Sequence, residues 1–285
     1  MLDLRYHVAS LSAVFIALIV GILVGVGISG RGFVDKSERR NFENQIAALQ
    51  TKVDQLSAQK ALLAQQGQAA ASFVQDAYPV LMHNRLAGKR IAVIVVGRSG
   101  GTAGSDVSRA LADAGATTAL YRALKEPVTL KPLLSALKGI PGFRTLPDIA
   151  HEIGQEWVTG GVTPVADKVS SLLVEEQRGS NGRPVDGVVV VERVAPVDAP
   201  TQRFVAGLLN GLRDGGVPLV GAEEVDTTLS LVPAWQAVHG MSSVDDIDTP
   251  TGKLALVLLL GGAPSGSFGL KPTADASLPR IEPGG

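Results

Sequence analysis

The sequence contains no cysteine and few other soft or imidazole donors, with four His and three Met in 285 residues. Disulfides, thiolate zinc sites and cysteine nucleophiles are therefore excluded. Two pairs place the remaining donors close together, Met82 with His83 and His239 with Met241, and such side chains suit copper. Two adjacent residues do not make a site, so these four are weak metal candidates, and core or loop positions are the ordinary interpretation.

The chain also lacks an excess of charge of either sign. The chain has 26 basic and 27 acidic residues, a formal net charge of -1. Nucleic-acid binding needs a basic surface, so this balance excludes nucleic acid as an expected partner.

A long apolar run from Val8 to Ile28 carries no charge and follows a short flank, residues 1–7. A helix of this length spans roughly 30 Å, the hydrocarbon thickness of a bilayer. A buried core helix would show a polar face. A cleaved signal peptide would have an apolar region of about 7–15 residues. The run therefore predicts an uncleaved transmembrane anchor over residues 8–28.

Small residues recur every four positions along this run, and we assign four of them to helix pairing: Ala13, Ala17, Gly21 and Gly25. Such a stripe lets two helices approach closely in lipid. The alternative is that Gly is simply frequent in membrane helices.

Four basic residues follow the anchor and only Arg5 precedes it: Arg31, Lys36, Arg39 and Arg40. Counted strictly, the positive-inside rule places the large domain in the cytoplasm, but long domains are translocated regardless of nearby charge. Charge alone leaves the topology open.

Apolar residues in segment 36–78 alternate between four- and three-residue spacing, with Lys60 at one position of the seam. This heptad pattern predicts a coiled coil, formed with a second copy of the chain or with a partner's helix. A lone amphipathic helix lying on the domain is the alternative. The residues assigned to helix pairing are Ile46, Leu49, Val53, Leu56 and Leu63.

The remaining chain predicts an α/β domain over residues 86–261. Apolar, β-branched runs at 90–97, 117–121, 186–192 and 217–221 read as strands, and helices are expected near 105–114 and 201–214. This alternation favours a small, doubly wound, mostly parallel sheet. We expect a helical insertion over about 127–182, cut by Gly and Pro, and an irregular tail over 262–285.

Three aspartates, Asp245, Asp246 and Asp248, precede a short apolar helix for which Thr249 is the expected N-cap and Pro250 the first residue. Negative charge is favourable near a helix N-terminus, which explains the aspartates simply. A site for a hard cation is the alternative.

The turn from Gly97 to Gly104 can be read as G-x-S-x-G, with Ser99 as a nucleophile and with Asp148 and His151, or His239, as possible partners. A coiled coil precedes it, however, where a hydrolase has several strands. The same turn could cradle a phosphate, but it departs from G-x-G-x-x-G. A tight turn that needs Gly is favoured. We therefore expect no enzyme activity, no catalytic residue and no bound cofactor.

The apolar motif from His7 to Gly27, the coil behind it and the motif SSVDDIDTPTGKLALVLLL from Ser242 to Leu260 resemble the MctB family over almost the whole chain. The most specific part is Val244–Asp248. The resemblance implies a single-pass protein of the cell membrane. It also implies an extracytoplasmic domain in the cell envelope and a role in copper efflux or homeostasis. Copper is implied by the resemblance alone, and no ligand motif is carried over. A structural or regulatory coiled-coil scaffold of the envelope, with no metal transport of its own, is the alternative.

The hydrolase interpretation has a direct test. We expect a fluorophosphonate probe not to label the protein, because the chain shows no second oxyanion loop beside the turn. Labelling of the wild type that disappears in Ser99→Ala would contradict this expectation.

Overall fold

The computed structural model describes residues 4–28, 34–97, 102–192, 198–280. The chain divides into two compact units, residues 1–70 and 71–285. Ser99 and part of the basic segment after the anchor lie outside the described residues.

The first unit consists of helix α1 (Leu4–Ile28) and most of helix α2 (Val34–Met82). Within α1, residues Tyr6–Gly27 are long and apolar enough to cross a membrane, and their side chains are exposed. This is consistent with a single-pass membrane anchor. Helix α2 continues without interruption through the predicted coiled-coil segment.

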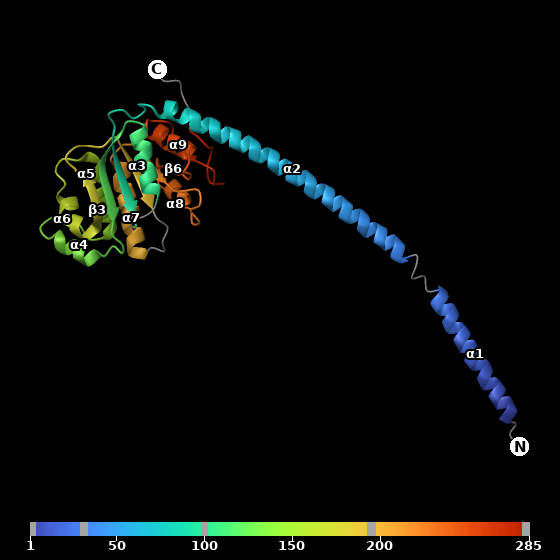
Figure 1. The fold of residues 1–285 in the computed structure, drawn as a ribbon. Coiled ribbons are helices and arrows are strands. Elements are labelled where there is room, and N and C mark those ends of the chain that lie inside the picture. The colour runs from blue at the N-terminus through green and yellow to red at the C-terminus, as the bar shows by residue number, and fades with distance from the viewer. Residues whose placement is uncertain (1–3, 29–33, 98–101, 193–197, 281–285) are drawn as a thin grey trace. The chain divides into compact units, whose positions relative to one another are not determined.

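The second unit is a mixed α/β structure around a seven-stranded, mostly parallel sheet with the order β3-β2-β1-β4-β5-β6-β7 (Figure 1). Strand β3 is antiparallel to β2, and the other neighbours are parallel. The strands are β1 (Arg90–Val96), β2 (Thr117–Leu124), β3 (Val174–Gly179), β4 (Gly187–Glu192), β5 (Leu219–Ala222), β6 (Ser242–Val244) and β7 (Ser267–Phe268). The helices are α3 (Ala103–Asp113), α4 (Leu130–Ala136), α5 (Leu146–Thr159), α6 (Pro164–Leu173), α7 (Ala199–Asp214), α8 (Val232–Gln236) and α9 (Pro250–Leu260).

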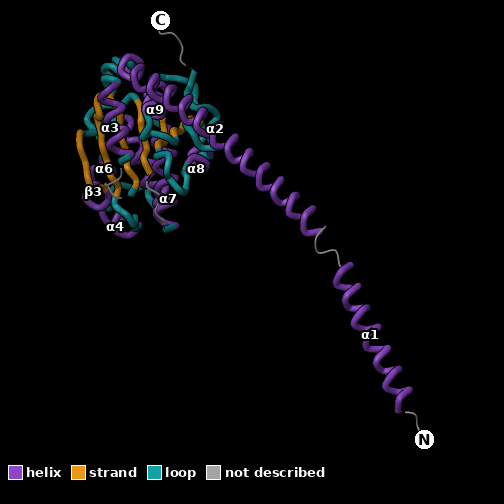
Figure 2. The backbone as a smooth tube through the Cα atoms, turned by 45° about the vertical axis from the view of Figure 1, so that its right-hand side comes forward, coloured by secondary structure: helices purple, strands orange, loops and turns teal. Residues whose placement is uncertain are grey.

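Helices cover both faces of the sheet, and Figure 2 shows the strands enclosed between them. Successive side chains of a strand point to opposite faces. In β1, Ile91 and Val93 therefore join the core beneath α3 and α9, while Ala92 and Ile94 join the core beneath α5 and α7. Burial on both faces explains why β1 and β4 are continuous apolar runs.

Two segments contain more regular structure than the sequence predicts. The predicted helical insertion holds α4, α5 and α6, but it also contains the edge strand β3. The predicted irregular tail contains β7, which extends the sheet. Both strands lack an apolar run, because β3 is polar and mostly exposed and β7 has two residues.

Helices α5 and α7 approach closely because glycines lie at their contact. A Cβ atom on Gly211 would lie 2.0 Å from the carbonyl oxygen of His151, and one on Gly207 would lie 2.6 Å from that of Pro147. Both atoms are backbone, so the helices would have to separate to admit even a methyl group.

Gly211→Ala should therefore destabilise the α/β unit by about 1–3 kcal/mol through overpacking. The matched control is Gly104→Ala, because a Cβ atom there meets only ordinary contacts of 3.7 and 3.8 Å. Both tryptophans, Trp157 and Trp235, lie in this unit, so tryptophan fluorescence during urea unfolding of the full chain reports its free energy of unfolding. Equal stability of the two variants would contradict the tight helix contact.

Candidate functional site at the carboxyl edge of the sheet

The structure does not bring the four predicted copper ligands together. Met82 and Met241 are buried in the two cores on opposite faces of the sheet. His83 and His239 are exposed, and the Nε2 atom of His83 lies 2.9 Å from the amide nitrogen of Asn84. Among the described residues, no group of three or more His, Cys, Asp or Glu side chains is placed to hold a metal ion.

The predicted helix-pairing residues all lie on α1 or α2. Their side chains are exposed, and those of the heptad seam keep more than half of their surface open, from 55% for Ile46 and Leu56 to 68% for Leu63. The stripe on α1 (Ala13, Ala17, Gly21 and Gly25) is equally open.

The residues considered as partners of Ser99 are engaged elsewhere. Asp148 caps α5, where its carboxylate accepts a hydrogen bond from the backbone N–H of Thr145 at 3.0 Å. His151 pairs with Asp214 at 2.9 Å, and His239 is exposed.

The Val244–Asp248 motif, in contrast, forms a dense polar cluster where β5 and β6 end. Asp245 is buried, and its Oδ1 atom accepts hydrogen bonds from the backbone N–H groups of Leu270 and Lys271 at 2.8 and 3.3 Å. Gly269 passes so close to this carboxylate that a Cβ atom would overlap it, and its φ of +141° also requires glycine. Asp245 therefore fixes the turn that follows β7.

Asp246 is completely buried, with 0% of its surface exposed. The hydroxyl of Thr249 donates a hydrogen bond to its Oδ2 atom at 2.9 Å, and none of the residues that the structure describes donates one to its Oδ1 atom. Burial raises the pKa of this carboxyl to about 6, and the nearby charges of Asp245 and Asp248 add to the effect. Thr249 also accepts a hydrogen bond from the N–H of Gly252, which confirms it as the N-cap of α9.

Glu223, which follows β5, completes the cluster. Its buried carboxylate accepts hydrogen bonds from Ser230 and Leu231 and forms an ion pair with Lys271 at 2.6 Å. Asp248 accepts a hydrogen bond from the N–H of Val225 at 2.9 Å. Sequence analysis missed Glu223 and Lys271, because their partners lie far along the chain and leave no local pattern.

Lys253 is the one charged residue of α9, and its ammonium pairs with Asp106 of α3 at 2.9 Å. Together these contacts make the motif a structural latch. It joins the loop after β5, the turn after β7 and two helices on one face of the sheet. The aspartates mainly accept hydrogen bonds from loop backbone rather than from α9, which refines their interpretation as helix-capping residues. The hard-cation alternative gains no support from this arrangement within the part of the chain that is described.

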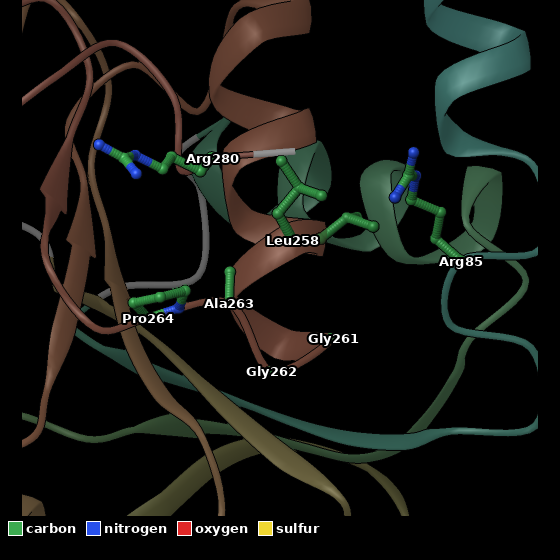
Figure 3. Close-up of a pocket in the computed structure, with 8 residues that line it drawn as sticks. Arg85, Leu258, Gly261, Gly262, Ala263, Pro264 and Arg280 are labelled. Atoms are coloured by element: carbon green, nitrogen blue, oxygen red, sulfur yellow. The ribbon is translucent and has the colours of Figure 1, made fainter. Parts of the chain in front are cut away.

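A pocket of about 400 Å³ lies at the other end of α9, lined by Arg85, Leu258, Pro264 and Arg280 among others. Figure 3 shows the two arginines on either side of Leu258. Both side chains are exposed, and they lie at a helix C-terminus, where cations are favourable without any ligand.

Known proteins are similar to this chain over most of its length. The family model described as "Copper transport outer membrane protein, MctB" matches residues 1–147 and 165–279. The chain belongs to the MctB family. The matched ranges include the apolar helix α1, helix α2 and the motif at Val244–Asp248.

Curated members of the MctB family are similar along their whole length. Proteins named "Copper transporter MctB" from Mycobacterium tuberculosis and Mycobacterium bovis are 25% identical over 311 residues, covering 94% of this chain and 96% of theirs. A solved glutamate dehydrogenase aligns with 65% of this chain and 38% of its own, at 15% identity and a TM-score of 0.25. That likeness is too low to support an argument.

The buried Asp246 gives a pH test of the latch. Because its folded pKa lies above that of the unfolded chain, the folded state binds more protons, and stability falls as the pH rises from about 4 through 6. Asp246→Asn should remove this loss and be more stable than the wild type above pH 6, by up to about 3 kcal/mol.

The measurement is urea unfolding of the full chain in detergent at pH 4, 5, 6 and 7.5, read by tryptophan fluorescence. Asp226→Asn serves as the control, since no hydrogen bond or ion pair of this side chain is described. A pH-independent difference between the wild type and Asp246→Asn would contradict a titration of Asp246 in this range.

Proposed function

We propose that this chain is a membrane-anchored component of copper handling in the cell envelope. In this proposal α1 crosses the membrane once, the α/β unit lies on the extracytoplasmic side, and the protein acts as an oligomer. The observation that carries the proposal is the MctB family match, which extends through both the anchor and the α/β unit. The curated relatives are named copper transporters and have nearly the same extent.

Pairing through α2 is the physical core of the proposal. A 49-residue helix with a repeated apolar seam exposes that seam to water unless a second helix covers it. The small-residue stripe on α1 offers a second contact within the lipid. We propose that the helix that covers the seam of α2 and the stripe of α1 belongs to another copy of this chain. In a parallel pair of identical chains, each seam then faces a seam and each stripe faces a stripe.

The proposal gives the chain a supporting part in copper efflux and no catalysis. A single helix cannot enclose a pore, and the run from Val8 to Ile28 carries no charge with which to line one. Several copies, or a partner, would supply any conduction path. The sheet, with helices on both faces, fits a doubly wound domain held near the membrane by the paired helices.

A structural or regulatory scaffold without metal transport is the second candidate. The length of α2 and its exposed seam favour it, because these features serve assembly whatever the cargo. The two candidates differ in one respect, which is whether loss of the protein changes cellular copper.

The assembly test replaces Leu49, Val53 and Leu56 with Asp. We expect this triple variant to sediment as a monomer in detergent while the wild type sediments as an oligomer, because three charges in the seam are incompatible with a paired core. The control places the same three charges on the opposite face, in Thr51→Asp, Gln55→Asp and Ala58→Asp. An unchanged mass of the seam variant would contradict pairing through α2.

The copper test uses the same variants in a host lacking its own copy. We expect cells without the protein, and cells with the seam variant, to accumulate copper and to grow poorly in medium that contains copper. Cells with the control variant should regain copper tolerance. If cells without the protein keep a normal copper content and normal copper tolerance, the copper role is contradicted. The structural or regulatory scaffold is then the remaining candidate function.

A further inference from the structure

A second pocket lies on the face of the sheet covered by α6, far along the chain from the Val244–Asp248 motif. Its volume is about 440 Å³. Every lining residue is polar or glycine: Arg122, Gly161, Thr163, Asp167, Ser170, Gln177, Gly179, Ser180, Asn181 and Gly182. A lining without apolar side chains is unsuited to lipid or peptide burial and suited to a small polar ligand.

Arg122 is the unusual member of this pocket, since only 5% of its surface is exposed. It lies on β2 between Leu120 and Leu124, which both belong to the core on that face. A charge buried this deeply is normally matched by a carboxylate. In the described part of the chain no carboxylate forms an ion pair with Arg122, although Asp167 lines the same pocket and favours the charged guanidinium.

The hydrogen bonds of Arg122 leave part of its guanidinium unused. Its Nη1 atom donates to the carbonyl oxygens of Tyr121 and Arg178 at 2.7 and 2.9 Å, and its Nη2 atom donates to Oδ1 of Asn181 at 2.9 Å. A guanidinium has five N–H donors. The Nε–H and one Nη2–H therefore have no protein acceptor among the described residues, and these two nitrogens form one edge of the fork that binds carboxylates bidentately.

The loop that closes the pocket is held in place by its own contacts. Asn181 accepts a hydrogen bond from the backbone N–H of Gly161 through its carbonyl oxygen at 2.9 Å. Gly179 has a φ of +73°, and a Cβ atom there would lie 2.0 Å from the carbonyl oxygen of Ala119. Any side chain at Gly179 would therefore displace the loop, so the pocket is a fixed part of the fold.

We propose that this pocket binds a small carboxylate whose other groups are hydrogen-bond donors, such as a sugar acid or a free amino acid. The carboxylate lies on the open edge of Arg122, and the donors of the ligand face Asp167 and the hydroxyl groups of Thr163 and Ser180. Asp167 disfavours a phosphate dianion, because it places a second negative charge in the same pocket. The proposal is independent of any role in copper handling.

The test uses the full chain in detergent, with D-glucuronate and glycine as probes and glucose and inorganic phosphate as comparisons, followed by isothermal titration and saturation-transfer NMR. We expect at least one carboxylate to bind with a Kd of about 1 mM or tighter, and glucose and phosphate to bind at least tenfold more weakly. Absence of carboxylate binding, or tighter binding of phosphate, would overturn the proposal.

Two variants assign the binding to this pocket. Arg122→Lys keeps the charge but loses the fork, so the carboxylate affinity should fall at least tenfold under conditions where urea unfolding shows that the variant is folded. Undiminished binding in a folded Arg122→Lys protein would refute the assignment.

Asp167→Asn changes an exposed side chain, so this second test can be made whether or not Arg122→Lys folds. In the Asp167→Asn variant the ratio of the Kd for phosphate to the Kd for the carboxylate should fall severalfold. If Arg122→Lys does not fold, Asp167→Asn decides alone, and an unchanged preference would refute the proposal.

Discussion

The α/β unit depends on one constraint, which is that backbone groups left over where parallel strands end must find hydrogen-bond partners. The short strands β5, β6 and β7 have few ladder bonds of their own, and buried carboxylates add acceptors to those of the neighbouring backbone. Asp245 holds the backbone after β7, and Glu223 holds the loop after β5. Because these bonds join segments distant in sequence, the carboxyl edge of the sheet is assembled as one piece with α9.

Directional polar contacts also explain how α9 remains in place. It is apolar on all sides and buried, so packing alone gives it little rotational preference. The cap at Thr249 and the ion pair between Lys253 and Asp106 provide directional contacts at its start. The close approach of Gly252 to the backbone of Asp246 then fixes the distance between helix and motif.

Much of the fold could be predicted from periodicity. Strands β1, β4 and β5 are predicted from apolar runs, because burial on both faces leaves few polar positions in them. Strand β2 is predicted only as far as Tyr121, before the polar Arg122, and continues to Leu124 in the structure. Strand β3 could not be recognised, since an edge strand with an exposed face carries Glu, Gln and Arg like a surface helix. Strands β6 and β7 are too short for any period. Backbone pairing with β5 and with each other places them, and the Asp245 side chain holds the turn after β7.

The candidate sites divide in the same way. Thr249 could be identified as an N-cap because capping is local in sequence. The backbone partners of Asp245 and Asp248 could not, because only the tertiary fold brings them close. The same holds for the Arg178 carbonyl and the Asn181 side chain, which accept hydrogen bonds from Arg122. The metal candidates show the converse, since Met82 and Met241 were neighbours of histidines in sequence and are separated by the sheet in space.

One consequence of α9 concerns the chain before it folds. The stretch from Leu254 to Leu260 is uninterruptedly apolar, which is the composition of segments that self-associate when exposed. Lys253 bounds it on one side, and two glycines and Pro264 bound it on the other. Charges, glycines and prolines that flank such a stretch disfavour β-type stacking between unfolded chains. The position of Lys253 is therefore favourable in the unfolded chain as well as in the fold, where it pairs with Asp106.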